Sequence, residues 1–232
     1  MPLAVVVPSY RPDERLPDRL ASFRASGFRR VVVVDDGSGP DFQAIFDAVS
    51  KMEGYIVLRH ETNLGKGVAL KTAFAHVLED CPECIGVVTA DADGQHAPED
   101  CRRVGEALLD DLSAIVLGTR DFSYRNVPFR SWWGNNWTVM LFSIFYGKRI
   151  PDTQTGLRAF GRVILANLLK VPGTGYEYEM AVLCRAARSR MQLRFVPIST
   201  IYEDDNSSSH FRPLRDTVRI YRVLFGNVFS RL

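Results

Sequence analysis

The chain has 232 residues, of which 46% are hydrophobic and 24% charged, and its formal net charge is +2. This length supports one folded domain spanning residues 1–232, and the small net charge argues against nucleic acid as a partner. Four irregularly spaced cysteines exclude a disulfide framework and favour a reducing compartment. The chain has neither a secretory signal nor a run of about 20 apolar residues that would span a membrane.

Short apolar runs rich in valine and isoleucine predict buried strands up to residue 121. Their apolarity is continuous, which is typical of strands covered on both faces in a parallel sheet. The runs are 3–10, 29–38, 54–61, 84–93 and 113–121. Segments with apolar residues at helical spacing separate them, at 13–26, 41–52, 65–80 and 98–111. We therefore expect an α/β domain with a Rossmann-like, mostly parallel sheet flanked by helices.

The pattern changes after residue 121. An aromatic, partly helical segment is expected at 129–149, a polar loop at 151–160, a helix at 175–190 and a strand at 192–200. From about residue 211 the chain is basic and amphipathic, with five arginines and one aspartate. This segment and 129–149 are each compatible with an interfacial helix at a membrane surface or with packing on the core or a partner. No repeat or domain boundary is evident.

Polar residues gather where the predicted strands end. Asp91 and Asp93 leave a buried strand two residues apart, so their oxygens can be directed to one point beyond the sheet. One or two carboxylates together with substrate phosphates are how Mg²⁺ or Mn²⁺ is usually held. Aspartate is also common in turns, so this spacing alone is equally compatible with a capped loop.

Eight motifs in chain order resemble the polyprenyl-phosphate glycosyltransferases of glycosyltransferase family 2, the group that includes dolichol-phosphate mannose and glucose synthases. They are VVVPSYRPDERL, VVVVDDGS, NLGKGVAL, DADGQH, LGTR, DTQTGLRAF, GYEYEM and YEDDNSSSHFRPLRD. The resemblance implies a GT-A fold, a nucleotide-sugar donor and a Mg²⁺ or Mn²⁺ cofactor. The acceptor it implies is a polyprenyl phosphate lipid.

The same resemblance implies which residues bind the donor. These donor-binding residues are Pro8, Tyr10, Asp35, Asp36, Lys66, Asp91 and Gln154. It makes Asp91, Asp93 and Gln95 the metal ligands, with a structural or substrate-contact role for His96. The residues themselves allow simpler interpretations: Asp35 and Asp36 can merely end a strand, and Lys66 can be a solvent lysine that opens a helix.

The acceptor phosphate is expected to meet Arg120, Arg130 and Ser131, because guanidinium groups suit phosphate oxygens. Many members of the group carry a basic residue where this chain has Trp132. The catalytic residues implied by the resemblance are Asp93, Arg120, Arg130, Asp152 and Arg158. Glu177 and Glu179 fall where transferases with hydroxyl acceptors place a general base, and a structural or sugar-contact role fits them equally. His210 and Arg212 are expected to close over the diphosphate.

The sequence thus predicts an inverting hexosyltransferase that takes a UDP-glucose or GDP-mannose type donor. The motif NLGKGVAL favours UDP-glucose, because it is more similar to the dolichol-phosphate glucose synthases. Transfer to a saccharide hydroxyl is the alternative within the fold. A nucleotidyltransferase and a non-catalytic nucleotide-binding module are alternatives from other classes. The expected location is cytoplasmic, peripheral at the cytoplasmic face of a membrane. Because many members of the group continue into membrane-spanning segments, a membrane-spanning partner subunit is also compatible with the chain.

Overall fold

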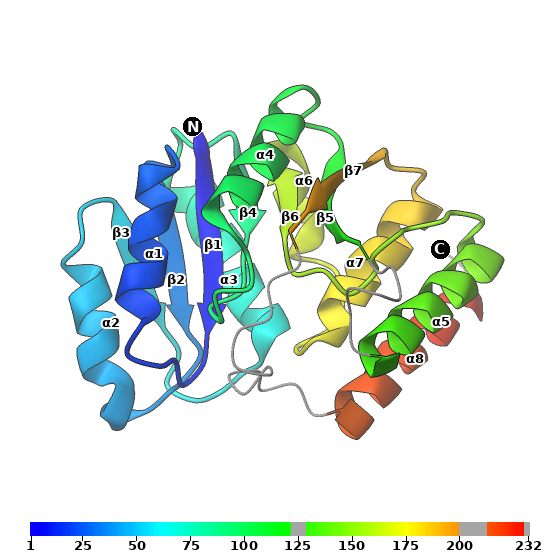
Figure 1. Ribbon diagram of the computed structural model, residues 1–232, viewed down its shortest axis with the longest axis horizontal. Helices are drawn as coiled ribbons and strands as arrows, with labels where there is room; N and C mark the ends of the chain where they lie inside the picture. Colours follow the sequence, from blue (N-terminus) through cyan, green and yellow to red (C-terminus); the bar gives the residue numbers. More distant parts are fainter. Residues whose placement is uncertain (122–128, 200–212, 230–232) are drawn as a thin grey trace.

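The computed structural model describes residues 1–121, 129–199 and 213–229, with side chains described for 1–121, 135–199 and 215–226. Within these residues one seven-stranded sheet has the order β3-β2-β1-β4-β6-β5-β7 (Figure 1). Its strands are β1 (Leu3–Ser9), β2 (Arg30–Asp35), β3 (Tyr55–Arg59), β4 (Gly86–Thr89), β5 (Ile115–Arg120), β6 (Arg158–Gly161) and β7 (Leu193–Ile198). All of the strands predicted from the apolar runs are present.

The sheet is parallel except at β6, which runs antiparallel to both β4 and β5. This confirms the mostly parallel sheet but corrects the expectation that the whole of 151–160 is a loop. The backbone of Ala159 pairs with Val88 of β4 and with Val116 of β5, which fixes a strand of only four residues. Four residues are too few to show the periodic apolar pattern on which the sequence prediction depended.

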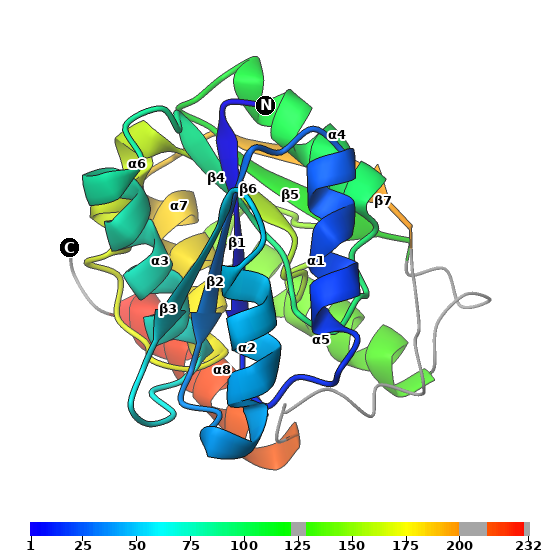
Figure 2. The ribbon, with the colours of Figure 1, turned by 90° about the vertical axis from the view of Figure 1, so that its left-hand side faces the viewer.

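The helices are α1 (Leu16–Ala25), η1 (Pro40–Phe42), α2 (Gln43–Ser50), α3 (Lys66–Asp80), α4 (Pro98–Leu109), α5 (Phe129–Tyr146), α6 (Arg162–Leu168), α7 (Glu177–Arg188) and α8 (Pro213–Phe229). Those expected between the apolar runs and at 175–190 are confirmed, and α6 was not foreseen. Two helical layers enclose the sheet, with α1 and α2 on one face and α3, α6 and α7 on the other (Figure 2).

The valine run of β2 shows why its apolarity is continuous. Val31 and Val33 pack into the core under α1, α2 and α4, whereas Val32 and Val34 pack into the opposite core under α3 and α7. Successive side chains of a strand point to opposite faces, so a strand covered on both sides needs an apolar residue at every position. Each fully buried valine contributes about 1.5–3 kcal/mol of hydrophobic stabilisation.

Helices α5 and α8 lie against each other beside α7 (Figure 1). Phe142 of α5 and Leu224 of α8 are fully buried in the core, while the rings of Phe145 and Phe225 meet edge to face at 5.3 Å and stay exposed. The two amphipathic segments therefore pack on the core through one face and leave another apolar face uncovered. Within the described residues, no helix combines the length and apolarity needed to cross a membrane.

The chain order of the strands places a crevice at the carboxyl end of β1. From β1 the chain moves outward through β2 and β3, and then returns to the other side of β1 as β4. The loops that follow β1 and β4 lead to α1 and α4 on the face opposite to α3, and residues of both loops line one cavity. Open α/β sheets bind ligands at such a switch point, outside the carboxyl ends of the strands.

Candidate active site

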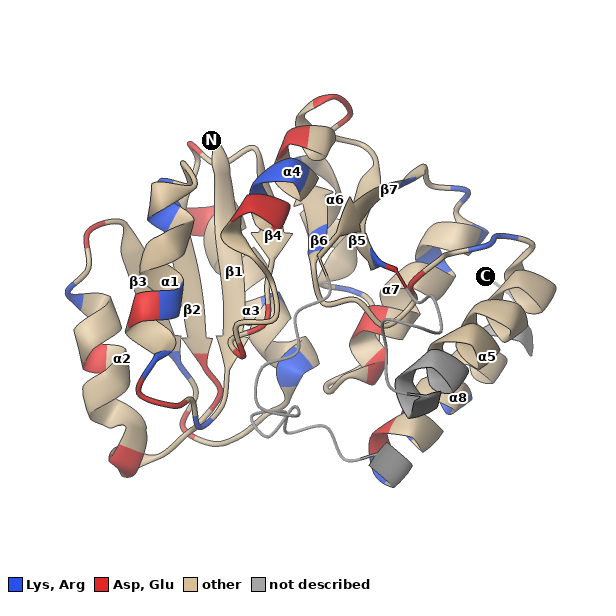
Figure 3. Ribbon diagram, viewed as in Figure 1, with Lys and Arg blue, Asp and Glu red and all other residues tan. Residues whose placement is uncertain are grey.

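A cavity of about 590 Å³ opens at this switch point. Loops and helices far apart in the sequence line it: 8–13 after β1, Asp36 after β2, 63–66 before α3, 91–93 after β4, 174–176 before α7, and residues 215, 216 and 219 of α8. Charged residues of both signs lie in the loops at this edge of the sheet (Figure 3). The volume is within the range of small-molecule and cofactor sites.

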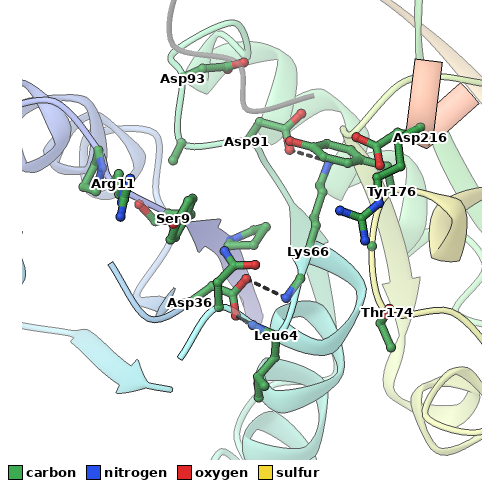
Figure 4. Close-up of a pocket in the computed structure, with 18 of the residues that line it drawn as sticks. Ser9, Arg11, Asp36, Leu64, Lys66, Asp91, Asp93, Thr174, Tyr176 and Asp216 are labelled. Carbon is green, nitrogen blue, oxygen red and sulfur yellow. Dashed lines mark hydrogen bonds and ion pairs between the residues drawn. The ribbon is translucent and has the colours of Figure 1, made fainter. Parts of the chain in front are cut away.

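An ion-pair network crosses the floor of the cavity. The Lys66 ammonium lies 2.7 Å from Oδ1 of Asp91 and 2.9 Å from Oε2 of Glu179, and Tyr176 lies beside it (Figure 4). Burial alone would lower the pKa of Lys66, but the two carboxylate charges outweigh it and raise that pKa well above its usual value. Burial likewise opposes ionisation of Asp91, yet the Lys66 charge and a His96 hydrogen bond hold the pKa of its carboxyl far below normal.

The other oxygen of Asp91 is enclosed by protein. Nε2 of His96 lies 3.4 Å from Oδ2 of Asp91, which agrees with the structural role expected for this histidine. Gly156, from the DTQTGLRAF motif, lies so close that a Cβ atom there would overlap Oδ2. Its carbonyl oxygen in turn accepts a hydrogen bond of 2.7 Å from the Thr89 hydroxyl at the end of β4. The DADGQH and DTQTGLRAF motifs thus fix this carboxylate together.

Asp93 also lines the cavity, and its Oδ1 accepts a hydrogen bond of 3.1 Å from the backbone amide of Gln95. Burial, reinforced by the charge of Asp91, raises the pKa of the Asp93 carboxyl. A divalent cation near both carboxylates would relieve this repulsion, so the donor set fits Mg²⁺ or Mn²⁺. In the described part of the chain no three His, Cys, Asp or Glu side chains gather as a metal site, so the fit requires oxygens from a bound ligand.

The two aspartates after β2 have different surroundings. Asp36 faces the cavity, and its carboxylate accepts hydrogen bonds from the backbone amides of Leu64 and Gly65 at 2.9 and 2.8 Å and contacts Nδ1 of His60. Asp35 is absent from the cavity wall, and its Oδ1 accepts the amide of Ser38 at 2.9 Å in a tight turn. Asp36 therefore shapes the floor of the cavity, while Asp35 shapes the turn behind it.

The glycines of NLGKG are packed closely against the loop ahead of α7. Gly65, at a φ of 100°, has no room for a Cβ atom, because the carbonyl oxygen of Thr174 would lie 2.5 Å away. Gly67 is similarly packed against Tyr178. The loop ahead of α7 is held in turn by Oε1 of Glu177, which accepts the amides of Thr174 and Gly175 at 2.9 and 3.0 Å. NLGKG and GYEYEM are therefore two halves of one wall.

Arg120, which is partly exposed, forms an ion pair with the buried Asp152. The Arg120 guanidinium donates from Nε to Oδ2 of Asp152 at 2.7 Å and from Nη2 to Oδ1 at 3.2 Å, and Asp152 is fully buried. Asp152 also accepts the backbone amide of Gln154, whose side chain is exposed. Neither Arg120, Asp152 nor Gln154 lines the cavity described above.

Arg158 is the first residue of β6 and is 1% exposed. Its guanidinium donates to the carbonyl oxygens of Thr155 at 2.9 Å and Glu179 at 2.7 Å, which ties the 152–157 loop to α7. The structure thus places Arg158, one of the catalytic residues implied by the resemblance, in the interior, where it links two segments of the chain. Arg130 and Ser131 belong to the first turns of α5, but their side chains, like all of His210 and Arg212, lie outside the described residues.

Pro8 and Tyr10 line the cavity as expected, and three further groups were missed by the sequence prediction. Arg215 and Arg219 reach it from α8, and Arg11 reaches it from a left-handed backbone with a φ of 48°. The Arg11 amide is held by the Ser38 hydroxyl at 2.8 Å. The charge-rich pattern of 211–232 was visible in the sequence, but only the packing of α8 on α7 brings its first turns to the cavity.

Comparisons with known proteins agree with this geometry. The sequence profile of glycosyl transferase family 2 matches residues 4–169. The UDP-N-acetylglucosamine–dolichyl-phosphate N-acetylglucosaminyltransferase of Methanococcus voltae is 27% identical over 217 residues, 86% of this chain and 86% of the relative. The polyprenol monophosphomannose synthase of Mycolicibacterium smegmatis is 28% identical over 203 residues, 84% of this chain and 76% of the relative.

A solved structure of glucosyl-3-phosphoglycerate synthase from Mycobacterium tuberculosis, in complex with Mn²⁺, UDP and glucosyl-3-phosphoglycerate, superimposes with a TM-score of 0.71. It is 17% identical in sequence, and the match covers 99% of this chain and 81% of the synthase. At this identity the likeness concerns the fold alone, and it confirms the expected GT-A fold.

Proposed function

The chain belongs to glycosyl transferase family 2, and we propose that it is an inverting enzyme that moves a sugar from a nucleoside diphosphate sugar to a polyprenyl phosphate. Two relatives named for transfer to, or synthesis of, lipid phosphates support this acceptor, since each matches most of the chain. The proposal includes both a UDP-sugar and GDP-mannose as donors. Of the two, a UDP-sugar is favoured, because the Methanococcus voltae relative is named for a UDP-sugar donor.

The donor end of the reaction fits the cavity at β1 and β4. Arg215 and Arg219 line the same cavity as Asp91 and Asp93 and supply positive charge that suits the diphosphate of the donor. Asp91 and Asp93 would hold Mg²⁺ or Mn²⁺, which supplies charge neutralisation at the departing nucleoside diphosphate. The hydrogen bonds of Asp36 keep the 63–66 segment against the cavity, so the donor meets a preformed surface.

The choice of acceptor rests on one observation: Glu177 and Glu179, the two glutamates of GYEYEM, are both bonded to other groups of the protein. Glu177 accepts two backbone amides and Glu179 is paired with the Lys66 ammonium, so each is a poor general base. A sugar hydroxyl would need such a base, whereas a phosphate monoester has a second pKa of about 6 and is mostly dianionic near pH 7. Its oxygen can attack the anomeric carbon unaided if it is held in line.

On the acceptor side, Asp152 fixes the orientation of Arg120 through two hydrogen bonds. We assign Arg120 to the acceptor phosphate because its guanidinium is oriented and its side chain is still 22% exposed, and we keep Arg130 and Ser131 as its partners from the start of α5. The side chain of Asn135 accepts the amide of Thr153 at 3.3 Å and donates to the carbonyl of Pro151 at 3.1 Å. The start of α5 is thereby tied to the loop that carries Asp152.

The uncovered surface of α5 and α8 supports a lipid substrate. We call it the α5–α8 face, and it consists of Trp137, Met140, Ile144 and Phe145 of α5 with Val218 and Phe225 of α8, each 36–66% exposed. Exposed arginines at 149, 215 and 222 accompany it. Aromatic and apolar side chains with basic neighbours are typical of a surface that lies in a membrane interface. We propose that this face rests on the cytoplasmic side of a membrane and so brings the prenyl phosphate to Arg120.

The test is a panel of UDP-glucose, UDP-N-acetylglucosamine and GDP-mannose with a short polyprenyl phosphate and Mg²⁺ or Mn²⁺, read by product mass. We expect a polyprenyl-phosphate sugar and one nucleoside diphosphate per turnover. Matched tubes contain the dephosphorylated polyprenol, a simple glycoside or 3-phosphoglycerate. Sugar on the glycoside would establish the hydroxyl-acceptor alternative, and release of pyrophosphate would establish a nucleotidyltransferase.

A further inference from the structure

The Lys66 ammonium occupies the side of Asp91 that faces the cavity. It is the first residue of α3, and its side chain is 13% exposed between two carboxylates contributed by the loop after β4 and by α7. The remaining oxygen of Asp91 faces His96 and the backbone of Gly156. Both oxygens of this carboxylate are thus engaged by the protein's own groups.

The charges around Lys66 show what the ammonium offsets. Asp91 and Asp93 line the cavity, and the charge of Asp91 acts on Asp93, while Lys66 contacts both Asp91 and Glu179. Buried carboxylates without a counter-charge are strongly unfavourable. Lys66 therefore supplies to this cluster the kind of neutralisation that a divalent cation would supply.

A divalent cation on Oδ1 of Asp91 would lie next to the Lys66 ammonium, and the two positive charges would repel each other at close range. We propose that Lys66 is a tethered competitor for the metal: the ion binds Asp91 only when the Lys66–Asp91 contact opens, while the Lys66–Glu179 contact retains the ammonium in the cavity. This inference rests on the proposed function for the identity of the metal and the donor. It goes beyond it by assigning to this lysine control over when the metal binds.

The nucleotide provides a second site for the displaced ammonium. A diphosphate in the cavity offers oxygens to Lys66 and to the metal at once, so metal and nucleotide bind with positive coupling. Coupling between two ligands is reciprocal, so Mn²⁺ strengthens UDP binding by the same factor by which UDP strengthens Mn²⁺ binding. The device keeps the enzyme from holding a metal without its donor.

Lys66→Met removes the competing charge and keeps an unbranched side chain of similar length. Mn²⁺ binding is measured in the absence of nucleotide from the electron paramagnetic resonance signal of free Mn²⁺. We expect the variant to bind Mn²⁺ about tenfold or more tightly than the unmodified chain, and UDP to strengthen Mn²⁺ binding less in the variant. Equal or weaker Mn²⁺ binding by folded Lys66→Met would overturn the inference.

Two further variants exclude simpler explanations. Lys71→Met alters a lysine of the same helix whose ammonium bonds the carbonyl of Gly173 at 2.9 Å, and Mn²⁺ affinity should stay unchanged. A gain in Lys71→Met equal to that in Lys66→Met would show a general charge effect and overturn the inference. The double variant Lys66→Met, Asp91→Asn should lose the increase in Mn²⁺ affinity, because Asp91 is the carboxylate that Lys66→Met makes accessible to the metal. If the increase is retained, Lys66 and Mn²⁺ do not compete for Asp91.

Stability is controlled by a variant that removes a carboxylate together with the lysine. The double variant Lys66→Met, Glu179→Gln has one fewer unpaired carboxylate than Lys66→Met, so it should fold even if the single variant does not. It should keep most of the increase in Mn²⁺ affinity. Loss of the gain there contradicts the assignment of Asp91. Failure of every donor in the transfer panel alongside tight Mn²⁺ binding by Lys66→Met would refute the proposed function alone, whereas transfer without that gain would refute only this inference.

Discussion

The proposed donor side and the proposed acceptor side of this molecule differ in how their motif residues are used. On the donor side, which comprises the loops after β1, β2 and β4 and the start of α3, most predicted residues face one cavity. On the proposed acceptor side, which comprises Arg120, Asp152, Arg158 and the start of α5, Asp152 and Arg158 are buried and bonded to other protein groups, whereas Arg120 keeps part of its side chain exposed. A motif therefore marks either a group that meets a ligand or a group that builds the wall behind it, and burial distinguishes them.

The difference has a topological cause. Parallel strands bring their carboxyl ends to one edge, so residues following β1, β2 and β4 converge without further help. The 152–157 segment enters the antiparallel strand β6 from that same edge and is almost wholly buried apart from Gln154. Buried polar groups must be hydrogen-bonded, so Asp152 and Arg158 are used to satisfy the loop itself.

Substituting a cavity carboxylate gives the strongest test of the donor side. Asp93→Asn should lower kcat about 10³-fold, equivalent to about 4 kcal/mol, because it removes a metal ligand while keeping the shape of the side chain. Initial rates at saturating donor and acceptor measure the effect, with circular dichroism to confirm the fold. Near-normal rates of Asp93→Asn in the presence of a chelator would contradict both the metal site and the division between the two sides.

The Arg120–Asp152 ion pair tests the acceptor side. Arg120→Ala should lower the free energy of unfolding by about 3 kcal/mol, because it leaves the fully buried Asp152 carboxylate without its partner. The double variant Arg120→Ala, Asp152→Ala should be destabilised by about 1–3 kcal/mol less than the sum of the single variants. Urea unfolding measures both quantities. Additive effects would show that the pair contributes no structural coupling, and the contrast with the donor side would then disappear.

The sequence predicted the parallel part of the fold because the signal there is local. Continuous valine runs and helical spacing specify each strand and helix within a few residues, and the resemblance then supplied the GT-A topology. The strand β6 was missed because its four residues form only against β4 and β5. The entry of Arg215 and Arg219 into the cavity was missed because it depends on how α8 packs on α7.

Contacts within the site were less predictable than its location. The pattern NLGKG marked a site, but its glycines proved to accommodate Thr174 and Tyr178, and its lysine proved to pair with Glu179. Each of these partners lies more than a hundred residues away in the sequence, so no local spacing could indicate it. Residue types indicated the chemistry of a motif, whereas its bonding partners could be identified only from the three-dimensional structure.

Gly156 lies in the DTQTGLRAF motif of the proposed acceptor side, but it is packed against Asp91 of the proposed donor side. A substitution at Gly156 therefore tests where the two sides meet. Gly156→Ala should weaken donor binding about tenfold, because the added Cβ displaces the carboxylate of Asp91. Gly226→Ala is the matched control, since nothing lies within 4 Å of a Cβ there and alanine favours the helix. Donor KM at saturating acceptor measures the effect. An unchanged donor KM in Gly156→Ala would show that Asp91 does not need this close packing.

The smallest effect is expected at Glu177, which belongs to the wall rather than to the cavity. Burial raises the pKa of its carboxyl, but the backbone amides of Gly175 and Thr174 outweigh burial and lower that pKa below its usual value. A group whose pKa is lowered on folding stabilises the native state above its unfolded-state pKa of about 4.3, and this stabilisation is lost as the pH falls through the folded-state pKa.

Glu177→Gln keeps an acceptor oxygen for the amides but removes the charge, so at pH 7 it should lower the free energy of unfolding by about 1 kcal/mol. Urea unfolding at several pH values should show this difference constant from pH 7 to about pH 5 and shrinking below about pH 4. A difference that persists undiminished at pH 3, or a loss of transfer activity far larger than the loss of stability, would move Glu177 from the wall to the reacting groups.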